Sequence, residues 1–280
     1  MRPVLFQIGE SFKAYGYGFC IAVGIILCVA FAYYRAKKKY AIDPDMLFNA
    51  AIIGIVAGFI GGKLLYWIVE IKTIIANPHF MLESLTGGFV VYGGLVLGIL
   101  APVVYLKWIK KVTVLEKVDL AVASIAMAQG IGRIGCFLAG CCFGREIPAG
   151  AWYSFIGVTF PAHPLCEAPA GVALIPTQLI SAGGDLLLFL FLWWYTKRER
   201  FAGENTCLYI GLYAIGRFLV EMLRGDKIRG FAGALSTSQW ISIGMLVLAV
   251  VLYFVFRKMG GAPLRVVGPY VEEGKKTTDK

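Results

Sequence analysis

The sequence has little charge and few histidines, and it lacks two familiar catalytic motifs. Charged residues make up only 16% of its 280 residues, which argues against an ordinary soluble domain. The two histidines, His79 and His163, lie far apart, so the sequence predicts no metal site of the His-Glu-x-x-His kind. No Gly-x-Ser-x-Gly motif occurs either, which argues against a serine hydrolase of the usual kind.

Cysteine is present but is not arranged in recognisable pairs. The odd count of seven and the scattered spacing fit neither a disulfide framework nor a Cys-x-x-Cys motif. Only Cys141, Cys142 and Cys166 fall in a predicted external loop, where a disulfide is one alternative and simple packing the other.

Long apolar runs dominate what the sequence does contain. Hydrophobic residues make up 59% of the chain, and the mean hydropathy is +0.73. Seven runs are each long enough to cross a bilayer as a helix: 16–34, 46–69, 88–108, 118–138, 176–196, 205–223 and 237–256. We therefore predict an all-α integral membrane protein, with seven transmembrane helices in one domain over residues 1–258. A disordered polar tail is expected at 259–280.

Lysine and arginine are distributed unevenly between the two sides of these runs. Seventeen of them follow the first, third, fifth and seventh runs, against seven in the N-terminus and the alternate loops. The positive-inside rule then places the N-terminus outside and the C-terminus in the cytoplasm. The net charge of +10 is thus attributed to membrane orientation, and no nucleic-acid partner is expected, because no basic helix or aromatic-basic surface is visible.

Two glycine patterns and one loop have structural interpretations. Gly54, Gly58 and Gly62 have the small-xxx-small spacing that lets membrane helices approach closely. Residues 130–135 match Gly-x-Gly-x-x-Gly, but a run that ends a membrane span lacks the strand and helix context of a dinucleotide site. We expect these glycines to let a lipid or another helix approach, with a broken or kinked backbone. The external loop at 139–175 is long enough to predict a function.

Three basic residues lie inside the apolar runs, namely Lys63, Arg133 and Arg217. A cation at the centre of a membrane helix costs about 3 kcal/mol, so such residues usually mark a polar site. We expect all three near the outer face, where the arginine forks suit a phosphate and predict a pocket for an anionic lipid headgroup. The alternative, strongest for Lys63, is a side chain that extends to water without further function.

Three further residues are candidates beside these cations. Glu221 follows Arg217 by four residues, which predicts an ion pair on one helical face. A catalytic role for Glu221 is a second alternative. Asp185 is a second possible neutralising partner. Tyr92 precedes Gly93 near the outer end of its run, where tyrosines also occur simply as part of the interfacial aromatic belt.

An ordered set of motifs extends over about residues 8–256. The string Gly-Gly-Phe-Val-Val-Tyr-Gly-Gly-Leu-Val-Leu-Gly occupies 87–98, and Gly-Arg-Ile-Gly-Cys-Phe occupies 132–137. The other members are Tyr15-Gly16, Gly61-Gly62-Lys63, Gly140, Gly144-Arg145, Pro176-Thr177-Gln178-Leu179, and Arg217 with Glu221 and Arg224. Together they resemble the prolipoprotein diacylglyceryl transferases, with their His-Gly-Gly-Leu segment and the signature around their essential arginine.

This resemblance implies a reaction and a location. The chain would transfer the diacylglyceryl group of phosphatidylglycerol to the lipobox cysteine thiol of an exported prolipoprotein, forming a thioether and releasing glycerol 1-phosphate. It would be a multi-pass protein of the bacterial inner membrane with its active site facing the outer leaflet. The resemblance implies no metal and no diffusible cofactor, and it leaves the oligomeric state open.

The resemblance also implies roles for individual residues. Arg133 and Arg217 would hold the phosphate and neutralise the departing charge, and Glu221 would orient Arg217. Tyr15 and Tyr213 would shape the headgroup site. The remaining substrate-binding positions are Lys63, Gln178 and Arg224, with the motif glycines Gly87, Gly93 and Gly144.

The chain departs from the family pattern at several positions. The family histidine before Gly-Gly is Tyr92 here, the asparagine three residues after the signature arginine is Cys136, and Ile175 and Ser181 replace a His and a Glu. Histidine suits deprotonation of a thiol near neutral pH better than tyrosine does. Either cations activate Tyr92, or another group is the base, or the acceptor differs. Cys136 as a covalent nucleophile is a further alternative.

Three other functions remain open from the sequence. One is a transferase of the same family with a different acceptor, and a second is a pocket without chemistry. The third is a transporter or flippase for an anionic lipid or solute, which should carry charged residues toward both faces. The clustering of the charged residues toward one face favours an active site over a transport path.

Overall fold

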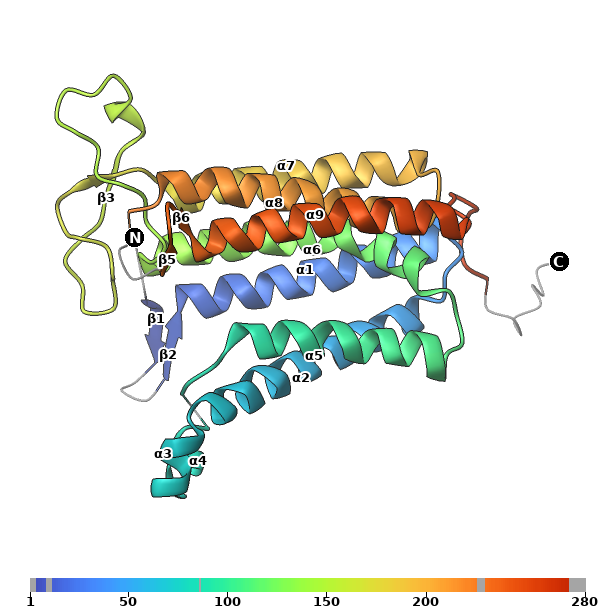
Figure 1. Ribbon diagram of the computed structural model, residues 1–280, viewed down its shortest axis with the longest axis horizontal. Coiled ribbons are helices and arrows are strands. Elements are labelled where there is room, and N and C mark those ends of the chain that lie inside the picture. Colours follow the sequence, from blue (N-terminus) through green and yellow to red (C-terminus); the bar gives the residue numbers. More distant parts are fainter. Residues whose placement is uncertain (1–3, 9–11, 86, 226–229, 272–280) are drawn as a thin grey trace. The chain divides into compact units, whose positions relative to one another are not determined.

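The computed structural model describes residues 4–8, 12–85, 87–225 and 230–271, and helices dominate it (Figure 1). Within these described residues, seven helical segments are long and apolar enough to cross a membrane. They are α1 (Gly16–Lys39), α2 (Pro44–Val69), α5 (Val91–Val104) continued by the π-helical turn η1 (Tyr105–Ile109), α6 (Val114–Ala139), α7 (Thr177–Tyr195) continued by the 3-10 turn η3 (Thr196–Arg198), α8 (Glu204–Leu223) and α9 (Thr237–Met259). The predicted all-α membrane class with seven transmembrane helices is confirmed, and the largest difference is at α1, which continues to Lys39.

Short elements fill the connections. A hairpin of β1 (Val4–Ile8) and β2 (Phe12–Tyr15) precedes α1, and α3 (Ile71–Ala76) and α4 (Phe80–Glu83) follow α2. The long loop after α6 contains η2 (Ser154–Ile156) and the antiparallel pair β3 (Val158–Thr159) and β4 (Ala173–Leu174). A second small hairpin, β5 (Phe231–Ala232) and β6 (Leu235–Ser236), leads into α9.

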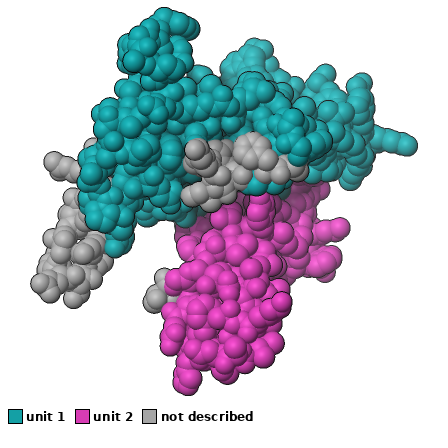
Figure 2. Space-filling view, turned by 60° about the vertical axis from the view of Figure 1, so that its left-hand side comes forward, with its two compact units in different colours: residues 1–32, 118–266 teal, residues 33–117, 267–280 magenta. Residues whose placement is uncertain are grey.

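The chain divides into two compact units, which Figure 2 distinguishes by colour. Unit 1 comprises residues 1–32 and 118–266 and therefore holds most of α1 and α6, together with α7, α8 and α9. Its core contains Ala123 and Ala126 of α6 packed with Leu188 and Leu192 of α7. The long loop and the β5–β6 hairpin lie at the end of this unit where α6 ends and α9 begins (Figure 1).

Unit 2 comprises residues 33–117 and 267–280 and is built on the packing of α2 against α5. The helices approach through glycines: a Cβ on Gly54 would lie 3.1 Å from the carbonyl oxygen of Gly98, and one on Gly58 would lie 3.5 Å from that of Gly94. The predicted close packing of the small-xxx-small pattern is therefore confirmed for these two positions. A Cβ on Gly62 would overlap the ring of Phe89.

Backbone N–H groups of the segment after α9 donate hydrogen bonds to a side chain and to a backbone carbonyl. In unit 1 the Leu264 N–H donates to Glu199, at 3.1 Å. In unit 2 the Val267 and Gly268 N–H groups both donate to the Lys39 carbonyl, at 3.0 and 3.2 Å. The disordered tail from 259 stays a prediction, and residues 272–280 lie outside the described part of the chain.

A buried carboxylate holds the start of α8. Asp119 of α6 accepts hydrogen bonds from the Gly203 N–H and from the N–H and hydroxyl of Thr206, the last two at 2.8 and 2.6 Å. The first N–H groups of a helix have no partner within it, and the helix dipole favours negative charge there. Asp119 is fully buried and so replaces water as the acceptor.

Asp119→Ala is therefore expected to lower the stability of the protein in detergent by about 3 kcal/mol, because buried donors lose their acceptor. Thermal unfolding followed by tryptophan fluorescence measures this. Asp119→Asn, which keeps one acceptor oxygen, should lose clearly less. Equal melting temperatures for Asp119→Ala and the wild type would contradict this account.

Candidate functional site

The two arginines of the predicted site line one cavity in unit 1. The cavity has a volume of about 180 Å³ and lies among α6, α7 and α8. Its lining residues are Arg133, Ile180, Ser181, Gly184, Asp185, Leu188, Leu212, Tyr213, Gly216, Arg217 and Val220. Gly184 and Gly216 contribute no side chain, so space is left between the guanidinium groups and the helix backbones. Asp185 also lines the cavity, where it offers one negative charge against two positive ones.

Arg217 is held in place by two partners. Its Nη1 lies 2.8 Å from Oε2 of Glu221, and its Nη2 donates to Oγ of Ser238 at 3.2 Å. The spacing of four residues brings Arg217 and Glu221 to the same face of α8, as the sequence predicted. Ser236 in turn donates to Glu221 Oε1 at 3.0 Å, so the carboxylate is fixed from α8 and from the start of α9.

Arg224 belongs to the same ionic group. Its Nη1 lies 4.0 Å from Oε2 of Glu221, and its side chain is only 8% exposed. Glu221 is thus placed between Arg217 and Arg224, one helical turn away on each side. Arg224 does not line the cavity.

Tyr213 lines the cavity through a stacked pair. Its ring packs on Tyr209 with a centroid distance of 6.0 Å and an angle of 20°. The Tyr209 hydroxyl donates to Oε1 of Gln129 at 2.7 Å, one turn before Arg133 on α6. The pair therefore links α8 to the helix that carries Arg133.

The glycines around Arg133 serve helix packing. A Cβ on Gly130 would lie 3.1 Å from the carbonyl oxygen of Ala182 in α7, and one on Gly135 would lie 3.2 Å from that of Tyr17 in α1. The expected approach of neighbouring helices is present. The expected break in the backbone is not, since α6 is an unbroken α-helix from Val114 to Ala139. The neighbouring helices fit against the glycines, so a break is not needed to bring them close.

Gly144 and Gln178 hold the start of the long loop. The Gly144 N–H donates to the Ile175 carbonyl at 3.0 Å, and a Cβ on Gly144 would overlap this neighbour. The buried Gln178 donates from Nε2 to the Cys141 carbonyl at 2.8 Å, and Thr177 donates to the Cys142 carbonyl at the same distance. Neither Gly144 nor Gln178 lines the cavity.

Lys63 in unit 2 is bound to backbone carbonyls. Its Nζ donates to Ser84 and Gly87, at 2.5 Å each, and to Gly88 at 2.9 Å. An ammonium group has three N–H donors, so all of them are used. Lys63 thereby anchors the connection between α4 and α5. It lines a cavity of about 530 Å³ together with the aromatic residues Phe59, Trp67 and Phe89.

Three other predicted residues occupy different surroundings. Tyr92 lies in the first turn of α5 and is 60% exposed, and Tyr15 lies at the end of β2 and is 50% exposed. Gly93 is buried against the Gly61 backbone, where it permits the contact of α5 with α2. The structure thus brings Arg133, Arg217 and Tyr213 to one cavity. It places Glu221 and Arg224 beside this cavity, Gly144 and Gln178 in the loop anchor, and Lys63, Gly87, Tyr92 and Gly93 in unit 2.

Gly93→Ala is expected to destabilise the protein by about 1–3 kcal/mol, because its Cβ would overlap the Gly61 carbonyl and force α2 and α5 apart. Gly87→Ala is the matched control: a Cβ there meets nothing within 4 Å. Melting temperatures in detergent test the pair, and a Gly93→Ala variant as stable as Gly87→Ala would refute the packing role.

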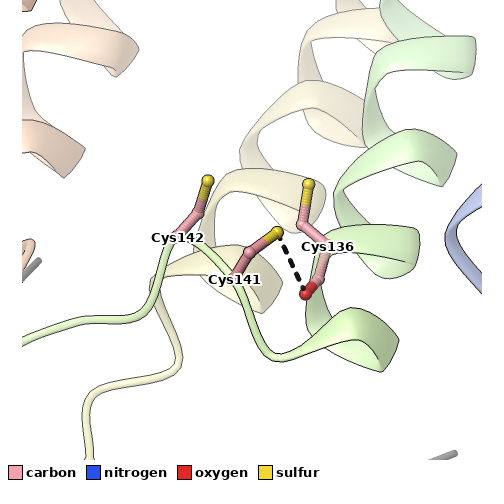
Figure 3. Close-up of side chains that lie close together, drawn as sticks. All are labelled: Cys136, Cys141 and Cys142. Carbon is pink, nitrogen blue, oxygen red and sulfur yellow. Dashed lines mark hydrogen bonds between the residues drawn. The ribbon is translucent and has the colours of Figure 1, made fainter. Parts of the chain in front are cut away.

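A cluster of three cysteines was not predicted from the sequence. The Sγ atoms of Cys136, at the end of α6, and of Cys141 and Cys142, in the following turn, all lie within 4.8 Å of one another (Figure 3). The only sequence signal was the Cys-x-x-x-x-Cys-Cys spacing. All seven cysteines are unpaired in this structure, and Cys166 lies against the Gly140 carbonyl instead of joining the cluster.

The surroundings of Cys142 favour its thiolate, whereas interactions with the Cys136 and Cys142 side chains raise the pKa of the Cys141 thiol. Interactions with the Cys136 and Cys141 side chains are the main cause that lowers the pKa of the Cys142 thiol. The positive charges of Arg224 and Arg133 act in the same direction, while partial burial opposes them.

Known proteins are similar to this chain over nearly its whole length. The sequence pattern of the LGT family, described as prolipoprotein diacylglyceryl transferase, matches residues 3–255. A phosphatidylglycerol–prolipoprotein diacylglyceryl transferase of Clostridium tetani is 45% identical over 262 residues, which are 92% of this chain and 100% of that protein. Phosphatidylglycerol–prolipoprotein diacylglyceryl transferase 2 of Clostridium perfringens is 44% identical over 265 residues, or 93% and 97% of the two chains. The phosphatidylglycerol–prolipoprotein diacylglyceryl transferase of Dehalococcoides mccartyi is 32% identical, over 91% of this chain and 94% of that protein.

Proposed function

The chain belongs to the prolipoprotein diacylglyceryl transferase family, and on this premise we propose that it transfers the diacylglyceryl group of phosphatidylglycerol to a prolipoprotein. The acceptor is the thiol of a lipobox cysteine, the product is a thioether, and glycerol 1-phosphate leaves. The protein is a multi-pass membrane protein.

One observation supports this function most directly, namely that Arg133 and Arg217 line the same cavity. A phosphodiester carries one negative charge, and two guanidinium groups with parallel N–H donors match its oxygens. When the carbon–oxygen bond breaks, its electron pair stays on the phosphate oxygen, so negative charge grows there. Fixed positive charges beside that oxygen stabilise the transition state more than the ground state.

Glu221 and Tyr213 act beside this pair. Glu221 holds Arg217 in position, and Tyr213 forms a wall of the headgroup site. Tyr92 takes the place of the family histidine, at an exposed position that an acceptor can reach. The site faces the outer leaflet of the inner membrane, and the loop 139–175 covers it and presents the acceptor.

The test is an assay of the purified full-length protein with phosphatidylglycerol and a lipobox peptide, in which thioether product and released glycerol phosphate are both measured. Arg133→Ala should abolish both products, and Arg257→Ala, at an exposed position of α9, should not. A folded wild-type protein that binds phosphatidylglycerol but forms no thioether would refute this acceptor. The alternative would then be a family member that uses a different acceptor, with Tyr92 and Cys136 as its distinguishing positions.

A further inference from the structure

The three-cysteine cluster has the dimensions of a metal site. Zinc–sulfur bonds of about 2.3 Å in a tetrahedral site place the sulfur atoms about 3.8 Å apart. The Sγ atoms of Cys136, Cys141 and Cys142 already lie within 4.8 Å of one another, so shifts of about 1 Å bring all three to this spacing. A disulfide, with sulfurs about 2 Å apart, would use only two of the three.

The backbone of Cys142 is held in an unfavourable conformation. Cys142 has a φ of 59°, a left-handed conformation that costs a residue other than glycine about 1 kcal/mol or more. The side chains of Thr177 and Gln178 fix this turn by donating to the Cys142 and Cys141 carbonyls, each at 2.8 Å. Thr177 and Gln178 are themselves almost completely buried. The turn thus keeps both thiols beside Cys136, as Figure 3 shows.

The cluster lies next to the cavity that Arg133 and Arg217 line. Cys136 follows Arg133 by three residues on α6, and Gln178 precedes Ser181 by three residues on α7. One helical turn, about 5 Å along the axis, therefore separates the cysteines from the cavity on both helices. Three thiolates and a divalent cation carry one net negative charge, which the neighbouring Arg133 and Arg224 offset.

We propose that Cys136, Cys141 and Cys142 bind a zinc ion as thiolates, and that the fourth position of this ion takes the acceptor thiol. The second part rests on the proposed transferase function. Thiolates are soft ligands that zinc prefers, and three protein ligands leave one position open, as in catalytic zinc sites. All three cysteines are half-buried, so a fourth ligand can reach the ion.

The family histidine suits deprotonation of the acceptor thiol, and Tyr92 stands in its place here. The zinc site provides another way to deprotonate this thiol. A metal-bound thiol is deprotonated, so the acceptor thiol loses its proton to water on binding and no strong base is required. The bound sulfur then attacks the glyceryl carbon attached to the phosphate oxygen. The sulfur–carbon bond forms, the carbon–oxygen bond breaks, and its electron pair leaves with glycerol phosphate toward Arg133 and Arg217. Zinc is neither oxidised nor reduced.

The first test measures the metal without any enzyme assay. Full-length protein purified in detergent with a thiol reductant should contain about one zinc per chain, and its X-ray absorption should show about three sulfur neighbours near 2.3 Å. Cys136→Ser and Cys142→Ser should lose most of this zinc, whereas Cys28→Ser, in α1 outside the cluster, should keep it. Equal zinc in all variants, copper in place of zinc, or a disulfide within the cluster with no zinc bound after reduction would overturn the site.

The second test addresses the acceptor. In cobalt-substituted protein without lipid, a lipobox peptide should intensify the thiolate-to-cobalt absorption, and the same peptide with serine in place of cysteine should not. An unchanged spectrum with metal present would overturn the role in acceptor binding. Transfer at the full rate by zinc-free protein would overturn it too, while leaving the proposed transferase intact. A spectral response without transfer from phosphatidylglycerol would uphold the zinc site and refute the proposed donor.

Discussion

Replacing Arg217 by lysine is expected to reduce diacylglyceryl transfer about a hundredfold while the protein remains folded. The charge is kept, but the guanidinium fork is lost. Arg217 uses Nη1 to bind Glu221 and Nη2 to bind Ser238, and this arrangement fixes the plane of the group beside the cavity. A lysine ammonium presents one point of charge and cannot hold a partner and a phosphate in the same plane.

The measurement is the rate of glycerol phosphate release at saturating phosphatidylglycerol. Arg200→Lys is the matched control, because Arg200 also pairs with a glutamate four residues away, yet its side chain is 63% exposed and it does not line the cavity. The control should transfer at the wild-type rate. If Arg217→Lys does so as well, the phosphate is not bound by the arginine fork.

The parts of this site that could be predicted depend on local spacing. Four residues on a helix bring Arg217 and Glu221 together whatever surrounds the helix, so the ion pair followed from the sequence alone. The helical spans followed equally from run length and composition. Both are properties of single segments and need no knowledge of what packs against them.

The parts that could not be predicted depend on contacts between distant segments. Lys63 stays a predicted lipid-binding residue, but its hydrogen bonds to carbonyls more than 20 residues away could not be predicted. Nothing in a run of apolar residues indicates where those carbonyls will lie. The unbroken α6 could not be predicted for the same reason. It depends on the backbone of α1 and α7, which packs closely against the glycines near Arg133.

The cysteine cluster could not be predicted from the sequence, because a turn brings its members together. Cys136 and Cys142 are six residues apart, too far for one helical face, and their spacing resembled no known ligand motif. They meet because α6 ends and the chain turns at Gly140, with a φ of 71°, and again at Cys142. A left-handed glycine after a helix is recognisable in a sequence. A cysteine in the left-handed conformation is not recognisable in a sequence. Here that conformation is supported by Thr177 of α7, whose hydroxyl donates to the Cys142 carbonyl.

Glu221→Gln is expected to lower the transfer rate about tenfold or more, with a smaller effect on the KM for phosphatidylglycerol. Glutamine keeps the size of the side chain and an oxygen for the Ser236 hydroxyl, but it removes the charge that orients Arg217. A loosened guanidinium still attracts the bound lipid. It stabilises the departing phosphate less well, because that interaction needs a fixed direction.

Two comparisons separate this positioning role from a merely structural one. Glu204 on the same helix is also buried and pairs with Arg200, so Glu204→Gln should lower the melting temperature but leave the transfer rate unchanged. If Glu221 acts through Arg217, the double variant Arg217→Lys with Glu221→Gln should be no slower than Arg217→Lys alone, since residues that act as one unit are not additive. Rates that multiply in the double variant would show that Glu221 contributes independently, and its assignment to Arg217 would then be wrong.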